Sequence, residues 1–335
     1  MQPIKHPIGR IFIHLILWVA VLISTVPFIW TTLQSLKTKK QAHSRTPLIW
    51  FEPTLDNYRE LWLDSVPDNF AVLAYGLIAI LLFFILLSVF ANQLPISRRT
   101  INWTIAGGLV LILWLIPQFI DTAEFYDYFV NTAIVGVGTV IISISIASLS
   151  AYGLARYVGL AGVILILMAL AFRSLPRLAF ALPYYWMGQM SGLHDTHFLV
   201  IITLTAVNQP FSLYMLRSFF MDIPREIEEA AMIDGASRFV AFIRVIVPIM
   251  WPGIFATSLF TLVLVYHEFL LVSILTQSNW TLAVAMRQYL PGISVAGSLP
   301  LQSAAAVSGA LPLAIVVLIF QKQLVKGLSA GAVKG

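Results

Sequence analysis

The side chains that could do chemistry are few in this sequence, and one short polar stretch holds the clearest group of them. Met221–Arg244 carries five carboxylates, Asp222 near its start and then Glu226, Glu228, Glu229 and Asp234. Cysteine is absent, which excludes disulfides, thiolate metal sites and cysteine nucleophiles. The six histidines are scattered, without the H-x-x-x-H or HExxH spacing of a zinc site. We therefore predict no catalytic residue and no metal site, and the carboxylates need another explanation.

The composition indicates a membrane protein. Of the 335 residues, 59% are hydrophobic and 10% are charged, whereas a soluble domain is roughly a quarter charged. So little charge cannot cover a water-soluble surface, which excludes a soluble enzyme. The net charge is +5, but the basic residues lie mostly in short segments between apolar runs. That pattern is typical of membrane topology and not of a nucleic-acid-binding face.

Apolar runs long enough to cross a bilayer recur along the chain. A spanning helix needs about 20 mostly apolar residues, because the hydrocarbon layer is about 30 Å thick. Eight segments meet that test: about Ile11–Leu33, Ala71–Asn92, Asn102–Ile120, Val130–Tyr152, Leu160–Pro183, His197–Phe219, Met250–Leu275 and Gln302–Phe320. The predicted fold class is an all-α polytopic membrane protein with about eight transmembrane helices.

The basic residues predict the orientation of these helices. Cytoplasmic loops carry an excess of Lys and Arg, and most basic segments fall on one side if both termini lie in the cytoplasm. The loop Lys37–Asp68 does not fit, because its five Lys and Arg then lie outside. Both termini inside is still the best fit to the whole pattern.

Local signals predict a helical hairpin within Met221–Arg244. Pro224 suits the first turn of a helix, where its missing N–H costs nothing, and the following carboxylates complement the helix dipole. Gly235 is placed to end that helix in a left-handed cap, and a second helix is expected from about Ser237 toward Pro248. Helices this short are marginal in water, and this pair is too polar to enter lipid. It must therefore dock on something else.

The residues of this hairpin carry a resemblance. Glu229-Ala230-Ala231, Gly235 and Val245-Ile246-Val247-Pro248 resemble the EAA signature of bacterial ABC-importer permeases, with Val245 and Val247 as conservative departures from the usual Ile-x-Leu-Pro. Further strings are similar to the maltose-type, MalG-like carbohydrate permeases: Leu55-Asp56-Asn57-Tyr58, Ala151-Tyr152-Gly153-Leu154-Ala155-Arg156, Gly192-Leu193-His194-Asp195-Thr196 and His267-Glu268-Phe269-Leu270-Leu271. The resemblance covers Ile11–Tyr58 and Phe129–Gly335.

The resemblance also implies a division of the chain. Such permeases usually have six helices, the type I ABC-importer core, so residues 61–125 read as an inserted transmembrane hairpin. The other expected parts are a first helix and outer loop at 1–60, a permease core at 126–326 with its coupling (EAA) loop at 221–248, and a cytoplasmic tail at 327–335. The insertion adds two spans, an even number, and so preserves the topology downstream.

The resemblance implies a function that depends on partner proteins. The expected assembly has a second, MalF-like permease subunit, an ATPase dimer and an extracytoplasmic solute-binding protein in a bacterial inner membrane, and it imports a carbohydrate or sugar derivative by alternating access. The chain has no G-x-x-x-x-G-K-[S/T] loop, so the partner ATPase would bind ATP and Mg. The residues expected to couple to that ATPase are Glu228, Glu229, Ala230, Ala231, Asp234, Gly235 and Pro248. Residues of the tail that could insert between the ATPase subunits are Gly327, Gly331, Lys334 and Gly335.

Polar groups within the spans are candidates for the substrate path, because such groups face protein or water in a membrane. The candidates are Asn131, Asn208, Gln209, His267 and Glu268. Each could instead serve a helix-to-helix hydrogen bond. Arg173 and Arg177 are placed near Pro176, around which the fifth segment could break, and they leave an anionic substrate such as a glycerol phosphate open.

Two other classes of protein are weighed against this interpretation. An ion-coupled secondary transporter would need inverted repeats and buried carboxylates at the membrane midplane, and neither is visible. A polytopic membrane enzyme would need clustered Asp, Glu or His beside a donor or metal site. The acidic cluster here belongs to the EAA-like string instead.

Overall fold

The computed structural model describes residues 7–44, 46–65, 79–80, 82–83, 98–157, 159–290 and 298–332. Within these ranges the secondary structure is helical, apart from one isolated bridge between Leu63 and Thr122. The chain divides into two compact units: unit 1 comprises Met1–Val130 and Ser294–Val307, and unit 2 comprises Asn131–Ile293 and Ser308–Gly335. Two long helices, α6 (Glu124–Arg156) and α15 (Leu299–Ala332), belong to both.

Unit 1 begins with a long apolar helix whose end is fastened to a short one. Its helices are α1 (Pro7–Ser35), α2 (Lys39–Ala42), α3 (Asp56–Trp62) and α5 (Arg98–Phe119). Asn57 of α3 donates hydrogen bonds from Nδ2 to the carbonyls of Ser35 (2.9 Å) and Lys37 (2.8 Å). Those bonds use carbonyls that the end of a helix leaves without partners, and so fix the turn after α1.

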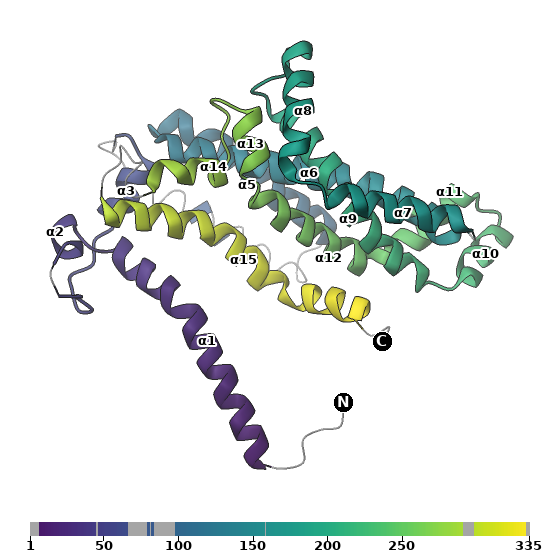
Figure 1. The fold of residues 1–335 in the computed structure, drawn as a ribbon, viewed down its shortest axis with the longest axis horizontal. Coiled ribbons are helices and arrows are strands. Elements are labelled where there is room, and N and C mark those ends of the chain that lie inside the picture. The colour runs from purple at the N-terminus through teal and green to yellow at the C-terminus, as the bar shows by residue number, and fades with distance from the viewer. Residues whose placement is uncertain are drawn as a thin grey trace. The chain divides into compact units, whose positions relative to one another are not determined.

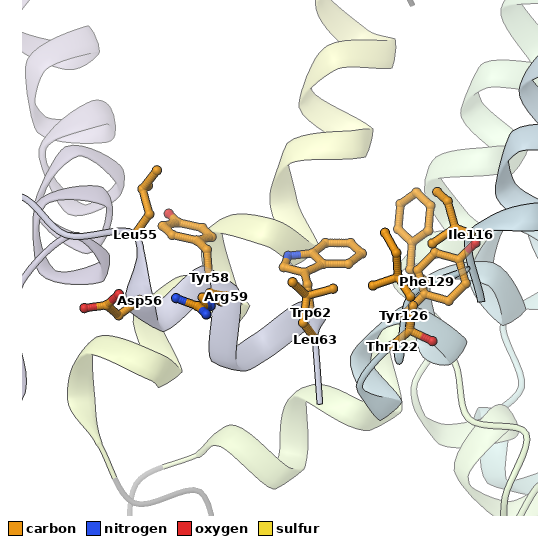
Figure 2. A pocket seen from close by; sticks show the side chains of 11 residues that line it. Leu55, Asp56, Tyr58, Arg59, Trp62, Leu63, Ile116, Thr122, Tyr126 and Phe129 are labelled. Atoms are coloured by element: carbon orange, nitrogen blue, oxygen red, sulfur yellow. The ribbon is translucent and has the colours of Figure 1, made fainter. Parts of the chain in front are cut away.

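A cavity of about 630 Å³ lies in unit 1 between α3, the end of α5 and the start of α6 (Figure 2). Aromatic rings of Tyr58, Trp62, Tyr126 and Phe129 form much of its wall, with Arg59 at one end. The Trp62 ring meets Phe129 edge to face, with centroids 5.7 Å apart. The cavity was not predicted, because its walls come from segments more than fifty residues apart.

Unit 2 carries the regions of interest for function. Its helices, besides parts of α6 and α15, are α7 (Leu160–Arg173), α8 (Arg177–Ser191), α9 (His197–Met221), α10 (Arg225–Ile233), α11 (Arg238–Ala241), the π-helical η2 (Phe242–Ile246), α12 (Val247–Tyr266), α13 (Leu270–Leu275), α14 (Leu282–Ala285) and η3 (Met286–Tyr289). In Figure 1, α10 and α11 lie at one end of this unit, away from α13 and α14.

Two apolar cores hold unit 2 together. One includes Leu204, Leu271 and Leu275 and joins α9 to α13. The other includes Leu216, Phe220 and Ile246 and joins the end of α9 to the π-helical segment beside α10 and α11. Each of these six side chains is fully buried. The second core supports the polar hairpin, because it lies where α9 ends and α12 begins.

Within the described residues, five helices are long and apolar enough to cross a membrane, or six if the bent pair α7–α8 counts as one span. The all-α membrane class is confirmed, whereas the number eight is not. The expected span Asn102–Ile120 corresponds to helix α5, which is not among those five. Of the expected span Ala71–Asn92, all but residues 79–80 and 82–83 lie outside the described residues.

Two expected spans have different bounds in the structure. The segment Leu160–Pro183 is not one helix: α7 ends at Arg173, and α8 leaves it at 89° (Figure 1). Pro176 explains the break, because proline lacks an N–H and disfavours helical geometry in the residue before it. The segment Met250–Leu275 is also wrong in its bounds. Its helix runs unbroken from Arg238 to Tyr266, and the separate helix α13 follows.

Candidate functional site

The polar hairpin forms as its local signals predict. Pro224 is the N-cap of α10, and Gly235 adopts a left-handed φ of 90° just after that helix ends. The N–H of Ala236 donates to the carbonyl of Ala231 (3.0 Å), which closes the helix end in the manner of a glycine cap. Ser237 then caps α11 by accepting from the N–H of Val240 (3.4 Å). The sequence thus predicted both helices and the turn between them.

The hairpin is continuous with a membrane-spanning helix, which the sequence did not predict. The second helix was expected to run toward Pro248, but α11, the π-helical segment and α12 form one unbroken helical rod of 29 residues. The N–H of Val247 donates to the carbonyl of Phe242, five residues back. Such π-turns often occur where the regular hydrogen bonding of an α-helix is interrupted. This one stands directly before Pro248, which lacks a backbone N–H and cannot donate a helical hydrogen bond. Displacement of the hairpin therefore displaces α12.

Glu228 ties the hairpin to a second spanning helix. Its carboxylate accepts from Nε of Arg156 (2.8 Å) and from the hydroxyl of Tyr152, both at the end of α6. Arg156 also donates from Nη1 to the carbonyls of Phe220 (3.3 Å) and Ile223 (3.1 Å). Glu228 is only 8% exposed. One of the two glutamates expected to face a partner protein is therefore bound within this chain.

The rest of the expected coupling residues lie on an open surface. Glu229, Ala230, Asp234, Gly235 and Pro248 are exposed, and Ala231 is half-buried. Two large apolar side chains stand beside them: Ile233 is 86% exposed and Phe239 is 62% exposed. An exposed apolar pair on a polar hairpin is a feature of protein interaction surfaces. We call Glu229, Ala230, Ile233, Asp234 and Phe239 the hairpin face.

The three amide side chains expected on a substrate path differ in their hydrogen bonds. Asn131 is held on both sides, accepting from Nε2 of His197 (2.7 Å) and donating to the carbonyl of Trp280 (3.0 Å). Asn208 is buried and donates to the carbonyl of Leu204 in its own helix (2.9 Å). The Oε1 of Gln209 accepts from the hydroxyl of Ser143 (3.1 Å), while its Nε2 is buried and has no hydrogen-bond partner within the described ranges.

A polar seam links three spanning helices beside Gln209. The hydroxyls of Ser143 in α6 and Ser212 in α9 are 3.2 Å apart, and Ser212 lies 3.0 Å from the hydroxyl of Thr261 in α12. All three residues are buried. The seam was not predicted, because isolated Ser and Thr residues in apolar helices carry no spacing signal. Hydrogen bonds of this kind hold membrane helices together.

Glu268 and His267 lie at the break after α12. Glu268 is 4% exposed, forms an ion pair with Arg177 of α8, and accepts from the N–H of Leu271 (3.2 Å). His267 is exposed, and its Nδ1 donates to the carbonyl of Val263 (2.9 Å). Glu268 thus joins two helices, as one of its two predicted roles requires.

A further anchor on this side of unit 2 was also not predicted. Asp195, with a left-handed φ of 60°, accepts from the backbone N–H groups of Gln277 (2.8 Å), Ser278 (3.1 Å) and Asn279 (3.1 Å) and from the Ser278 hydroxyl (2.5 Å). Burial alone would raise the pKa of Asp195, but these hydrogen bonds to its charged form lower the pKa to about 2. The loop before α9 is thereby fixed to the loop after α13.

The expected tail is helical over most of its length. Gly327 and Gly331 lie within α15, which continues to Ala332, while Lys334 and Gly335 lie outside the described residues. Within the described ranges, no three His, Asp or Glu side chains are placed to share a metal ion.

Comparisons with known proteins find relatives for the part of the chain that carries the hairpin. A family model described as "Binding-protein-dependent transport system inner membrane component" matches residues 143–330. The chain is 31% identical over 220 residues to the trehalose/maltose transport system permease protein MalG of Thermococcus litoralis, covering 64% of this chain and 77% of that protein. It is 30% identical over 272 residues to the trehalose transport system permease protein SugB of Mycobacterium tuberculosis, covering 71% and 99%.

A solved structure shares the fold. It is a bacterial ABC transporter involved in the import of the acidic polysaccharide alginate, and it matches this chain with a TM-score of 0.68 and 17% sequence identity. The match covers 96% of this chain and 99% of the other.

Proposed function

Because this chain belongs to the family of binding-protein-dependent transport system inner membrane components, we propose that it is the permease subunit of an ATP-driven importer that carries a carbohydrate. Membership in the family is shown by a match over more than half of the chain, and it confirms the expected class, a multi-pass transport component and not an enzyme. The carbohydrate substrate, the partners and the roles of single residues are the proposal.

The observation that carries the proposal is that the hairpin face is exposed and is connected to two membrane-spanning helices. The face is exposed, as a docking surface must be, and the turn at Gly235 presents both of its helices. Behind it, α11 continues into α12, and Glu228 joins α10 to Arg156 of α6. Force applied to the hairpin by a partner therefore reaches two spanning helices directly.

The work of hydrolysis belongs to the partner in this proposal. The chain contains no phosphate-binding loop, so a dimer of cytoplasmic ATPases binds ATP and Mg and receives the hairpin face. A second, MalF-like permease subunit completes the path, and an extracytoplasmic binding protein delivers the solute. The tail residues Gly327, Gly331, Lys334 and Gly335 are further candidates for contact with the ATPases.

The orientation follows from the same arrangement. An ATPase that hydrolyses cytoplasmic ATP needs the hairpin on the cytoplasmic side of a bacterial inner membrane. Since basic residues stand at the start of α1 and in the last part of α15 and favour that side, we place both termini in the cytoplasm. The loops fixed by Asp195 then lie on the outer side, where a binding protein would dock.

The names of the two relatives support a carbohydrate as the solute, because both are permeases of trehalose or trehalose/maltose systems. Within the span region, Gln209 has a buried donor left over, which suits a sugar hydroxyl. Asn131 and Asn208 are held by this chain, so we propose that they shape the path and do not contact the solute. His267 is exposed and is a candidate contact.

Family membership argues against the two rival classes. The geometry of Glu268 is a further argument against the ion-coupled transporter, because this buried carboxylate between spanning helices is paired with Arg177. A carboxylate held in this way is poorly placed to bind and release a coupling ion.

The test is reconstitution of this chain with its cognate subunits in proteoliposomes. A carbohydrate identified by a ligand screen on the cognate binding protein should stimulate ATP hydrolysis and enter the vesicles. A complex that hydrolyses ATP and carries only non-carbohydrate solutes would contradict the proposed substrate class.

A further inference from the structure

Arg173 is a cation of unit 2 whose guanidinium packs on an aromatic ring. Arg173 ends α7, and the centre of its guanidinium lies 4.6 Å from the ring centroid of Phe211 in α9. Its Nη1 atom is buried and has no hydrogen-bond partner among the residues that the structure describes. Within the described part of the chain no carboxylate forms an ion pair with it, whereas Arg177, four residues further on, is paired with Glu268.

Arg173 lies well inside the membrane-spanning region. Phe211 is fourteen residues after the start of α9 at His197 and ten before its end at Met221, which is about 21 Å and about 15 Å of helical rise. The Phe211 ring also packs edge to face on Phe260 of α12 (6.3 Å). At this depth a charged side chain is costly, and it faces a protein interior or a water-filled path, not lipid.

Arg173 lies beside a break in the spanning helices. The residue is half-buried and stands directly before the break at Ser174–Pro176. The second break, after α12, is joined to this one by the Arg177–Glu268 pair. Non-helical backbone at membrane depth is tolerated where it is buried in protein or lines a cavity, and transporters build solute sites at such broken helices.

The charges at the two breaks do not balance. Among the described residues at the breaks, Arg173 and Arg177 carry two positive charges and Glu268 carries one negative charge, which is paired with Arg177. The contact with Phe211 offers a cation–π attraction, but it uses none of the N–H donors of Arg173. A guanidinium fork with free donors matches a carboxylate, sulfonate or phosphate group.

We propose that Arg173 binds the anionic group of the transported solute, so that the substrate is an acidic sugar carrying a carboxylate, sulfonate or phosphate. This inference rests on the proposed function as a carbohydrate importer and narrows it. Arg173 supplies the counter-charge that an anion needs in a low-dielectric path, and Arg177 is kept from that role by Glu268. The neighbouring rings of Phe211 and Phe260 offer apolar faces to the sugar.

The experiment uses the reconstituted complex with its cognate binding protein. The probes are an oligouronate and the same oligosaccharide with its carboxyl groups reduced to alcohols, together with a sulfonated and a phosphorylated sugar, each beside its neutral counterpart. Uptake and solute-stimulated ATP hydrolysis are measured for wild type, R173Q and R173K. The matched control is R287Q, which removes an exposed arginine from the same unit.

The proposal predicts that one acidic probe is transported and its neutral counterpart is not. R173Q should lower uptake of that probe at least tenfold, R173K should keep part of it, and R287Q should match wild type.

If neutral carbohydrates are transported and R173Q carries them as well as wild type does, the anionic substrate is refuted while the carbohydrate importer stands. The anionic substrate is likewise refuted if wild type carries neutral sugars and R173Q fails to assemble, because Arg173 then pairs with a carboxylate of the second permease. If no sugar of either kind stimulates the complex, the proposed function itself fails.

Discussion

The carboxylate of Glu228 and the guanidinium of Arg156 lie 2.8 Å apart and join the polar hairpin to the end of α6. Both side chains are largely buried, at 11% and 16% exposure. Since α11 is already continuous with α12, the pair gives the hairpin a second connection to the membrane helices. Through these two connections, movement of the docking surface is transmitted to the membrane helices α6 and α12.

We predict that Glu228→Gln weakens this connection. Breaking one partner of a buried pair typically costs about 3 kcal/mol, because the other charge is left uncompensated. The thermal unfolding midpoint of the purified complex should fall, and transport should fall by more than ATP hydrolysis does. Glu229→Gln is the matched control, since Glu229 is exposed and its loss should weaken ATPase binding without lowering the unfolding midpoint. Equal effects of the two variants on stability would contradict the internal role of Glu228.

The left-handed turn at Gly235 predicts a ranking of substitutions. A side chain at φ 90° is strained by about 1–2 kcal/mol, and a Cβ there meets nothing within 4 Å. The cost therefore comes from the backbone alone. Gly235→Asn should be mild, because Asn tolerates this region, Gly235→Ala intermediate, and Gly235→Val should uncouple the ATPase while membrane insertion is normal.

Co-purification of the ATPase with each Gly235 variant checks this ranking. If Gly235→Val binds the ATPase and supports uptake as wild type does, the hairpin turn has no part in coupling.

The Arg177–Glu268 pair predicts a non-additive result. Removing one charge leaves the other unpaired at membrane depth, so R177Q and E268Q should each destabilise the protein, by about 2 kcal/mol given that Arg177 is partly exposed. The double variant R177Q/E268Q should be more stable than the less stable single variant, because no unpaired charge is left. Thermal unfolding of the four proteins gives the coupling between the sites. Strict additivity would show that the pair does not form.

Asp195 predicts a pH dependence of stability. Its pKa is lowered to about 2 in the folded protein, below the ordinary value near 4, so the charged form stabilises the fold. That contribution is complete above about pH 4 and is lost as the pH falls toward 2. Asp195→Asn should lower the unfolding midpoint at pH 7 and flatten its decline between pH 4 and 2. Glu60→Gln, which changes an exposed carboxylate in unit 1, should leave that decline as it is. A decline in Asp195→Asn as steep as that of wild type would contradict the anchoring role.

Local signals made the hairpin predictable, whereas its connections were not. Pro224, Gly235 and Ser237 act on their immediate neighbours, so their types and spacing were enough to predict two helices and the turn. Glu228 meets Arg156 across 72 residues of sequence, and nothing local distinguished it from Glu229. The continuation of the second helix past Pro248 into α12 was not predicted, because it depends on the π-turn that precedes this proline.

For the spanning helices, too, the sequence predicted local features but not contacts between distant residues. Hydrophobicity and length predicted where most of them lie, and Pro176 marked one break. The break after Tyr266 has no proline, so its bounds could not be read from composition. The polar seam of Ser143, Ser212 and Thr261 depends on three helices meeting, which only the folded chain reveals.

The proposed function depends above all on the hairpin face docking on a partner ATPase, and cross-linking is the sharpest test of that contact. The chain has no cysteine, so a single cysteine at Ala230 reports on that position alone. In membranes that hold the cognate complex, it should cross-link to the ATPase, with a yield that changes when nucleotide is bound. A cysteine at Gln277, in the loop fixed by Asp195, should give no such product. Cross-linking from Gln277 and none from Ala230 would show that the ATPase does not dock on the hairpin face.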